Sequence, residues 1–252
     1  MASSKLLSFL LLSLFVIFIF IDPSNSSPDN NFTEAQSRIK SKKVNLSLYY
    51  ESLCPYCRSF IVSQLVKVFN TDLLSIIDLR LVPWGNAQYV KPNKTIICQH
   101  GEDECYLNTI HACAINIWPD PRKHFNFIYC VENQGLHAED NLHSDGADAV
   151  WKACSAALGM DQKLIKNCYD NGYGRKLLLR YATETDDLHP KHLFVPWVTV
   201  NNQPLYDQYE NFIAYVCNAY KDKALIKACM PHSLHVTGEK LPIPPVCYAE
   251  RR

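Results

Sequence analysis

The clearest chemical motif in this chain is a pair of cysteines separated by two residues, Cys54-Pro55-Tyr56-Cys57. This spacing allows a disulfide across a single helical turn, and such a pair can exchange disulfides with a second molecule. The first sulfur attacks as a thiolate, and the second then attacks the mixed disulfide and releases the reduced partner. We therefore predict thiol–disulfide exchange, with Cys54 as the exposed nucleophile and Cys57 as the resolving cysteine.

A structural disulfide or half of a zinc site are the alternatives for such a motif. The flanking pattern favours redox chemistry, because Cys54 lies between a predicted strand (Val44–Tyr50) and a predicted helix (55–70). Unpaired N–H groups and a partial positive charge at a helix N-terminus stabilise a thiolate. We expect this effect to lower the pKa of Cys54.

A lowered pKa would matter most in acid. An ordinary thiol with a pKa of ~8.5 is only ~0.03% thiolate at pH 5. A pKa of about 4 would raise that fraction roughly 3000-fold and cost ~100-fold in intrinsic nucleophilicity, a net gain of ~30-fold. At pH 7 the same change is slightly harmful. A strongly depressed pKa at Cys54 is therefore our hypothesis for a site that works at acidic pH.

Two groups of elements must position this motif. Strands at Val44–Tyr50 and 76–82 flank the helix at 55–70, which predicts a β-α-β unit with a right-handed crossover. A hairpin follows much later, with strands at 196–200 and 203–206 around Asn201-Asn202, and then a helix at 208–220. Between them the pattern is helical from Cys98 to about Leu188, with amphipathic stretches at 147–158, 161–169 and 175–183.

This order predicts an α/β thioredoxin-like fold with a helical insertion, at about 98–190, between a β-α-β half and a β-β-α half. In such folds a cis proline before the third strand packs beside the two cysteines and exposes a backbone edge for an extended substrate. Pro196 occupies that position, after Val195. We expect Pro196 to be cis and to position the substrate together with Val195; an ordinary strand-start proline is the alternative.

The ends of the chain have a different character. Residues 1–26 are predicted to be a cleaved signal peptide, because Lys5 precedes an apolar run that Asp22-Pro23 ends below the ~20 residues of a membrane span. A retained signal anchor is the alternative. Residues 27–42 resemble a flexible leader or pro-segment. We place the main domain at 43–220 and a cysteine-containing tail at 221–252.

Composition restricts the partners and the compartment. Lys plus Arg equals Asp plus Glu, 25 each, so the sequence predicts no nucleic-acid partner and, after signal cleavage, no stable membrane insertion. Eleven cysteines behind a signal peptide predict an oxidising compartment, either outside the cell or in a lysosome or vacuole lumen. Glycosylation sequons at Asn31 and Asn93 agree with this route, whereas Asn45 lies in a predicted strand and is a weaker candidate.

Without Cys54 and Cys57, nine of the eleven cysteines remain, so one should be free or link two chains in a dimer. Cys154 can pair with Cys168 across a predicted turn between helices, and Cys217 with Cys229 at the start of the tail. Sequence alone does not fix this connectivity.

A second motif carries a family resemblance. The positions Cys98, Gln99, His100, Gly101, Glu104, Cys105, Asn108 and Cys113 match the pattern CQHGxxECxxNxxxxC. With Val195–Asn201 and the late Cys217, Cys229 and Cys247, they make the chain similar to the gamma-interferon-inducible lysosomal thiol reductases from about Val44 to Cys247. The resemblance implies a glycoprotein that reduces protein disulfides at acidic pH through Cys54 and Cys57. It also implies proteolytic trimming at either end. The partners that we expect are disulfide-containing protein substrates and a small-thiol reductant, and we expect no cofactor.

The physical role of this second motif stays open at this stage. Its cysteines can staple the start of the insertion, and His100 and Asn108 can hydrogen-bond a loop. Metal binding by Cys98, His100 and Cys105 is conceivable but disfavoured in an oxidising lumen, so we expect no metal. The acidic run Glu102-Asp103-Glu104 is expected to be a solvated face, with substrate steering as the alternative.

Two other functions compete with disulfide reduction. A disulfide oxidase or isomerase would use the same residues, because the net direction depends on reduction potential and compartment. A secreted, disulfide-stabilised binding module without turnover would use Cys54 and Cys57 only as a structural element.

Overall fold

The computed structural model describes residues 41–92, 94–135, 144–230 and 244–249. The chain divides into two units, Met1–Ile39 and Lys40–Arg252, and the fold below belongs to the second. The predicted signal peptide, most of the predicted leader, Asn31 and Asn93 lie outside the described residues. Among the helices that the structure describes, none has the length and apolar character needed to cross a bilayer.

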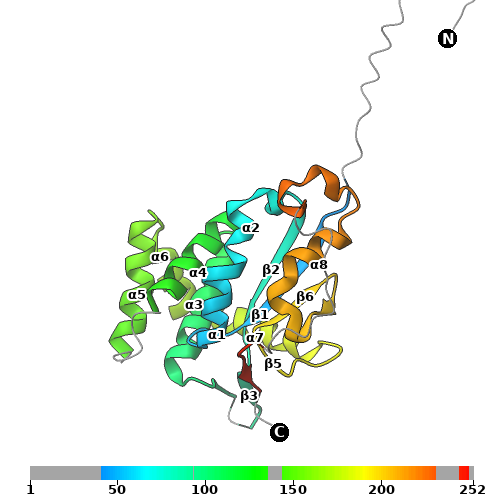
Figure 1. Ribbon diagram of the computed structural model, residues 1–252. Coiled ribbons are helices and arrows are strands. Elements are labelled where there is room, and N and C mark those ends of the chain that lie inside the picture. The colour runs from blue at the N-terminus through cyan, green and yellow to red at the C-terminus, as the bar shows by residue number, and fades with distance from the viewer. Residues whose placement is uncertain (1–40, 93, 136–143, 231–243, 250–252) are drawn as a thin grey trace, which may run out of the picture. The chain divides into compact units, whose positions relative to one another are not determined.

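The central sheet has four strands in the order β2-β1-β6-β7. Strand β1 (Val44–Tyr50) runs parallel to β2 (Ile77–Pro83) and antiparallel to β6 (Trp197–Val200), which pairs in turn with β7 (Gln203–Pro204). Both predicted halves therefore share one sheet (Figure 1), with Leu48 of β1 facing Leu81 and Val198 in register. This topology confirms the thioredoxin-like α/β fold.

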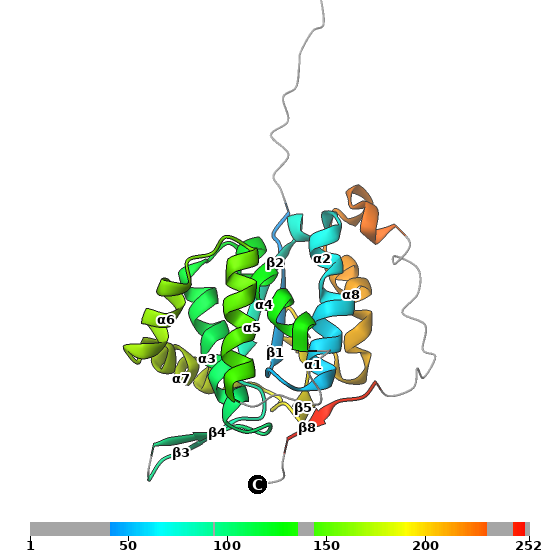
Figure 2. The same ribbon diagram turned by 90° about the vertical axis from the view of Figure 1, so that its left-hand side faces the viewer.

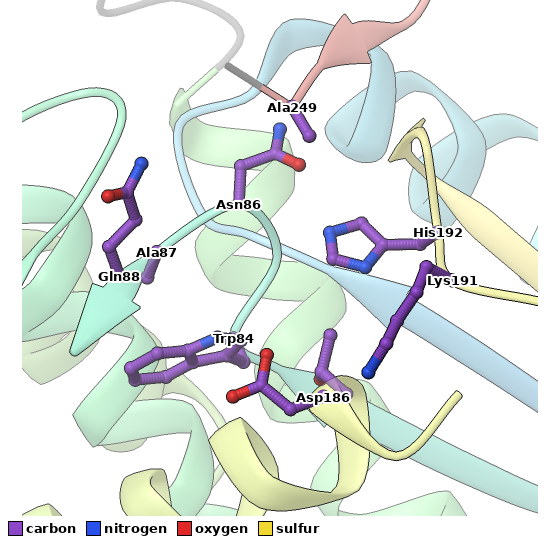
Figure 3. A pocket seen from close by; sticks show the side chains of 9 residues that line it. Trp84, Asn86, Ala87, Gln88, Asp186, Lys191, His192 and Ala249 are labelled. Atoms are coloured by element: carbon purple, nitrogen blue, oxygen red, sulfur yellow. The ribbon is translucent and has the colours of Figure 1, made fainter. Parts of the chain in front are cut away.

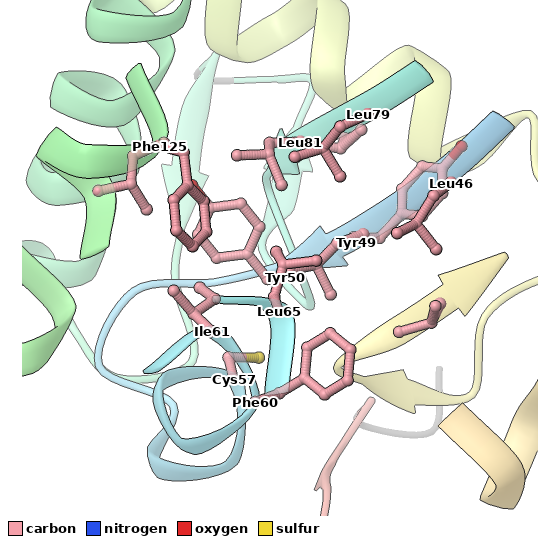
Figure 4. Packing of buried hydrophobic residues seen from close by; sticks show 14 of the residues in the cluster. Leu46, Tyr49, Tyr50, Cys57, Phe60, Ile61, Leu65, Leu79, Leu81 and Phe125 are labelled. Carbon is pink, nitrogen blue, oxygen red and sulfur yellow. The ribbon is translucent and has the colours of Figure 1, made fainter. Parts of the chain in front are cut away.

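Strand β1 is buried on both faces, because helices pack on each side of the sheet. Leu48 and Tyr49 are adjacent and so point to opposite faces of the strand, yet both are buried. Figure 4 shows Tyr50 packed beside Ile61 and Leu65 of the first helical segment. Each such side chain contributes roughly 1.5–3 kcal/mol by leaving water, so the centre of the sheet is a rigid base for the loop that follows β1.

The predicted helix at 55–70 is present but not regular. It consists of α1 (Pro55–Ser59), a π-helical segment (Phe60–Leu65) and α2 (Lys67–Asn70), followed by a 3-10 turn at Asp72–Ser75. Local sequence did not indicate the π segment, which widens the helix where Phe60 packs edge-on against Tyr209 and Phe212. π-helical turns of this kind are frequent next to functional sites.

The insertion contains five helices: α3 (Glu102–Ile117), α4 (Pro121–Gly135), α5 (Ser144–Ala157), α6 (Gln162–Asp170) and α7 (Tyr173–Asp186). The three predicted amphipathic stretches correspond to the last three of these helices. Figure 2 shows the group lying together beside the sheet.

Two disulfides hold the insertion together. Cys113 of α3 bonds Cys168 of α6, and Cys130 of α4 bonds Cys154 of α5. The predicted Cys154–Cys168 pair is wrong, because the two cysteines face different neighbouring helices across their shared turn. Gly174 keeps α7 close to α3, since a Cβ there would lie 2.7 Å from the Cys113 sulfur.

The C-terminal half follows the predicted order. The turn between β6 and β7 has Asn201 and Asn202 at φ 49° and 65°, the left-handed conformation that a two-residue hairpin needs. A 3-10 helix (Tyr206–Asn211) leads into α8 (Phe212–Ala219), and two short 3-10 turns (Lys223–Leu225 and Lys227–Cys229) follow. The predicted disulfide between Cys217 and Cys229 is confirmed.

Two short strand pairs were not predicted. Strands β3 (Gln88–Val90) and β4 (Thr95–Ile97) form a hairpin after β2. Strand β5 (Phe194–Val195) pairs antiparallel with β8 (Cys247–Tyr248), near the end of the chain. Figure 2 shows β5 and β8 at the end of the sheet where α1 begins, which places the C-terminal segment beside the two-cysteine motif.

Candidate active site

Cys54 lies at the start of the first helix, as the sequence predicts. Leu53 has φ 67°, which turns the chain sharply after β1, and Cys54 is the N-cap residue with extended backbone. Pro55 occupies the first turn, where a missing N–H costs nothing, and the Arg58 N–H donates to the Cys54 carbonyl at 3.1 Å.

The expected exposure and pairing of Cys54 are wrong. Cys54 is fully buried, and its disulfide partner is Cys247, 193 residues away in the C-terminal segment, with 6.5 Å between the Cα atoms. Cys57 is a free thiol and is also fully buried. The physical reason is the pairing of β8 with β5, which brings the Cys247 sulfur to the mouth of the helix.

This pairing also resolves the odd cysteine count. All eleven cysteines lie within the described residues, and five disulfides leave Cys57 as the free thiol. No cysteine is therefore left over at the surface of the described structure for a disulfide-linked dimer.

The Cys57 thiol points into the core, where Figure 4 shows it among Phe60 and Ile61. Burial raises the pKa of Cys57 well above the ordinary value of a thiol, and the nearby carboxyl of Glu51 raises it further. A hydrogen bond with the Glu51 backbone acts in the opposite direction. Cys57 therefore holds its proton in this state.

Val195 and Pro196 lie where the sequence analysis places them. The peptide bond between them is cis, as expected. Val195 faces Cys247 in the β5–β8 pair, Phe194 faces Tyr248, and the Ala249 N–H donates to the Leu193 carbonyl at 3.1 Å. The backbone edge that we predicted to receive a substrate is thus occupied by residues of the same chain.

A buried carboxyl, Glu51, joins the elements around the disulfide. One of its oxygens accepts the Asn86 N–H at 2.7 Å, and the other lies 3.3 Å from Nε2 of His100. Gly85 makes room for it, because a Cβ at this position, at φ 60°, would overlap the Glu51 side chain. Nε2 of His100 lies in turn 3.8 Å from the Cys247 sulfur.

The second motif forms the adjacent wall of the site. A disulfide between Cys98 and Cys105 closes its loop, and Gly101 has φ 87° at the start of α3. Inside this loop, the His100 N–H donates to Glu104 at 2.6 Å. Asn108 accepts the Ser52 N–H at 2.8 Å and so holds the loop before Cys54. The expectation that His100 and Asn108 hydrogen-bond loops is correct.

Glu104 differs from its expected role as part of a solvated face. Glu102 is exposed, but the Glu104 side chain is fully buried. Burial raises the pKa of Glu104 to about 9, and the neighbouring carboxyl of Glu51 adds to the effect. Glu104 is therefore a neutral buried hydrogen-bonding residue in acid and near neutrality.

A second buried polar cluster lies behind the loop. Nδ1 of His111 is 3.2 Å from the Tyr50 hydroxyl, 3.3 Å from the Ser52 hydroxyl and 3.9 Å from Glu132. Burial lowers the pKa of His111 to about 3 and raises that of Glu132 to about 8. Both side chains are then neutral between these values, so the group is a neutral polar cluster and not an ion pair.

Two groups of residues that include His100 and two cysteines are unsuited to a metal ion. Glu51, Cys54, His100 and Cys247 bring their ligand atoms within 4.8 Å of one another. However, Cys54 and Cys247 share a disulfide, and so do Cys98 and Cys105 of the conceivable set in the second motif. Metals bind thiolates, which neither disulfide offers.

A cavity of about 290 Å³ adjoins this site (Figure 3). Its lining includes Trp84, Asn86, Asp186, Lys191, His192 and Ala249. Asn86 lines this cavity and also donates to the Cys247 carbonyl, and Ala249 follows β8, so the cavity adjoins the C-terminal segment.

The structure brings together the residues predicted from the sequence, except for Cys113, which lies between α3 and α6; these residues are Cys54, Cys57, Val195, Pro196 and the second motif. Glu51, Asn86 and the site role of Cys247 were not predicted. The Gly85-Asn86 pair, a turn signal shortly after the predicted strand at 76–82, was the available hint for the loop that binds Glu51.

Comparison with known proteins gives consistent relatives. The family model described as "Gamma interferon inducible lysosomal thiol reductase (GILT)" matches residues 45–158. An Arabidopsis thaliana protein named gamma-interferon-responsive lysosomal thiol protein is 45% identical over 202 residues, covering 79% of this chain and 80% of the relative. The gamma-interferon-inducible lysosomal thiol reductase of Mus musculus is 35% identical over 185 residues, covering 72% and 69%.

Solved structures show more distant similarity. A thiol-disulfide oxidoreductase, MdbA, from Actinomyces oris has a TM-score of 0.45 at 13% identity, covering 65% of this chain and 73% of the other. A putative protein disulfide isomerase from Nitrosomonas europaea has a TM-score of 0.43 at 13% identity, covering 63% and 85%.

Proposed function

Because the chain belongs to the gamma-interferon-inducible lysosomal thiol reductase family, a family of oxidoreductases, we propose that Cys54 and Cys57 reduce protein disulfides at acidic pH. One observation carries the assignment of the site. Cys54 already forms a disulfide with a cysteine on an extended strand, while Cys57, one helical turn away, remains a free thiol. This arrangement has the chemical form of the mixed disulfide in thiol exchange.

The proposed reaction has two exchange steps. The Cys54 thiolate attacks one sulfur of a substrate disulfide, and the other substrate sulfur leaves and takes up a proton. The Cys57 thiol then loses its proton and attacks the Cys54 sulfur, which releases the second substrate sulfur and forms a Cys54–Cys57 disulfide. Two small-thiol molecules reduce this disulfide and become oxidised to one disulfide between them, which restores the starting state.

The burial of Cys57 fits the resolving role. Its raised pKa keeps the thiol protonated, and its position in the core keeps it away from external disulfides. The sulfur of Cys54, in the same helical turn, is then its natural target, so resolution follows the first step and does not compete with it.

His100 is the candidate proton donor of this reaction. Its Nε2 lies 3.8 Å from the Cys247 sulfur, which is the sulfur that leaves when the bond to Cys54 breaks. An imidazole can give a proton to a departing thiolate, and the Glu51 carboxyl at 3.3 Å orients the ring. We assign His100 a catalytic role and Glu51 a positioning role.

The compartment we propose is a lysosome or vacuole lumen, or the cell exterior. Ten of eleven cysteines are in disulfides, which requires an oxidising route. The buried acids Glu104 and Glu132, with pKa values of about 9 and 8, are neutral and therefore well accommodated at acidic pH.

Trapping the mixed disulfide tests the proposal. The protein is first reduced with a small thiol at pH 5, freed of reductant and mixed with insulin. A Cys57→Ser variant should accumulate a covalent adduct at Cys54, because the resolving thiol is missing, and the wild type should release reduced insulin chains. A Cys54→Ser variant is the control and should trap nothing. A folded Cys57→Ser variant that traps no insulin would instead favour a binding module without turnover.

A further inference from the structure

We propose that residues 246–249 are an internal substrate: they occupy the substrate groove as an extended strand and close it through a mixed disulfide between Cys247 and Cys54. This inference rests on the proposed function and deepens it. The groove should accordingly bind cysteine-containing segments in extended conformation, and it should recognise them mainly through hydrogen bonds to their backbone.

The backbone pairing comes first. Strand β8 adds antiparallel to β5, in a separate two-stranded sheet that contains only these strands among the described residues. The Ala249 N–H extends the pairing by donating to the Leu193 carbonyl at 3.1 Å. Without the C-terminal segment, β5 would present an open edge, which an extended peptide can fill by strand addition.

Two side chains bind backbone carbonyls of the segment. Nδ2 of Asn86 donates to the Cys247 carbonyl at 3.1 Å, and Nε2 of Gln99 donates to the Tyr248 carbonyl at 2.9 Å. Asn86 also donates to the Gln99 side chain at 2.7 Å, so the two amides support each other. These contacts depend on the backbone of the bound segment, so peptides of different sequence would satisfy them.

The side chains of the segment make fewer specific contacts than its backbone does. The Tyr248 ring contacts Phe194 edge-on at 6.1 Å between centroids, yet 63% of its surface stays exposed. Cys247 is buried, and the Pro245 carbonyl accepts the Tyr209 hydroxyl at 3.1 Å. The groove therefore favours an aromatic residue after the cysteine without requiring it. A substrate that continues beyond this point would meet the cavity of Figure 3 at Ala249.

The chemistry around Cys54 makes this disulfide exchangeable. Cys57, the free thiol, lies one helical turn from Cys54. Attack of Cys57 on the Cys54 sulfur forms the Cys54–Cys57 bond, breaks the bond to Cys247, and passes the Cys57 proton to the Cys247 thiolate through the surrounding acid–base groups. The number of disulfides is unchanged, so no oxidant or reductant is consumed. Two small-thiol molecules then reduce the Cys54–Cys57 disulfide, become oxidised to one disulfide between them, and leave Cys54 free for an external substrate.

A tethered substrate should make the enzyme latent. A segment on the same chain has an effective concentration on the order of millimolar. At about 0.1 mM insulin, the initial rate of insulin reduction should therefore be about tenfold lower than in a protein whose C-terminal segment cannot form the disulfide.

The full chain, purified without reductant, is assayed for insulin reduction at pH 5 after adding a small thiol. Wild type should show a lag, and Cys247→Ser should show none. Peptide mapping should find Cys54 linked to Cys247 in the wild type alone.

A peptide assay tests the groove separately, in case Cys247→Ser fails to fold. The probe is a synthetic peptide of residues 244–249, PPVCYA, with its cysteine in a disulfide with 5-thio-2-nitrobenzoate. Its matched control is the same peptide N-methylated at the alanine, which lacks only the N–H that donates to Leu193. Pre-reduced wild type should cleave the first peptide about 3–10-fold faster, the value of one hydrogen bond.

The outcomes separate the two proposals. Pre-reduced enzyme that fails to reduce insulin overturns the proposed function. Pre-reduced enzyme that is active, with no lag in the untreated wild type and equal rates for the two peptides, overturns the internal substrate alone. A Cys54–Cys247 bond that survives while insulin is being reduced would also overturn it, because the bond would then be a staple.

Discussion

Cys54 and Cys57 belong to the same helical turn but differ in what surrounds their sulfurs. The Cys57 thiol lies among aromatic and aliphatic side chains, whereas the Cys54 sulfur is bonded to Cys247 next to the imidazole of His100. An imidazole that can donate a proton lies beside the bond to Cys54, whereas the Cys57 thiol is buried and hydrogen-bonds the backbone of Glu51. Proton transfer should therefore concern the sulfur that leaves Cys54.

Replacing His100 should reveal this proton transfer. We expect His100→Gln to slow reduction of insulin at pH 5 by about tenfold or more in the pre-reduced enzyme, because the departing alkyl thiolate then lacks a proton donor. The measurement is the rate of insulin reduction under conditions where the second exchange step, in which the substrate sulfur leaves Cys54, limits turnover.

A substrate with a good leaving group is the control for His100. A disulfide that releases 5-thio-2-nitrobenzoate needs no protonation, because this aromatic thiolate is stable. His100→Gln should therefore slow its reduction much less than that of insulin. Equal losses on both substrates would mean that His100 only holds the loop in place, and the catalytic assignment would fail.

At the scale of elements, the loop at 84–87 must leave space for the Glu51 carboxyl. Gly85 and Gly159 have almost the same φ, 60° and 61°, but only at Gly85 would a Cβ meet another side chain, while Gly159 faces open space. The two glycines therefore form a matched pair, in which backbone conformation is constant and the overlap with Glu51 differs.

Alanine at these two glycines should have unequal effects. Gly159→Ala should lower the free energy of unfolding by about 1–2 kcal/mol, the cost of a left-handed alanine. Gly85→Ala should cost about 1–3 kcal/mol more through overpacking, and it should also reduce activity by displacing Glu51 from His100. Urea unfolding measures the first effect and insulin reduction the second. Equal unfolding free energies for the two variants would contradict this account of Gly85.

The elements also show where local sequence stops being informative. The bounds of Val44–Tyr50 were predicted without error, because seven alternating β-favouring residues carry a clear period. Strands β3, β4, β5 and β8 have only two or three residues each, too few for any period. Strand β8 depends on pairing with Val195 and on a disulfide across 193 residues, so its partners lie far outside any local window.

The site was predictable to the same degree. Cys54 and Pro196 could be placed because each occupies a fixed point in the order of strands and helices. The covering of Cys54 by Cys247 could not, because eleven cysteines permit many pairings and spacing does not select among them. Glu51 carries no motif either, and its role depends on Asn86 and His100 arriving from other loops.

At the scale of the whole molecule, buried acids should make the fold more stable in acid than in base. In the unfolded chain a Glu titrates near 4.3, whereas burial raises Glu132 to about 8 and Glu104 to about 9. Between pH 6.5 and 8 the unfolded chain thus binds fewer protons at these sites than the folded one, so stability falls as pH rises. His111, with its pKa of about 3, opposes this trend only below pH ~6.5, where an unfolded His would be charged.

The free energy of unfolding should accordingly decrease from pH 6.5 to 8, by at most ~1.4 kcal/mol per pH unit for each of the two acids. Glu132→Gln should flatten this slope by about half, because the amide stays neutral at every pH and can still accept from Ser52. The positive charge of Arg58 lowers the pKa of Glu132 and so makes the pH dependence of stability smaller than this maximum.

Exposed Glu102 gives the control, since Glu102→Gln should leave the pH dependence of stability unchanged. Urea titrations of the disulfide-intact protein at several pH values provide the measurement, and a wild-type stability that does not fall between pH 6.5 and 8 would show that these carboxyls are ionised in the folded state.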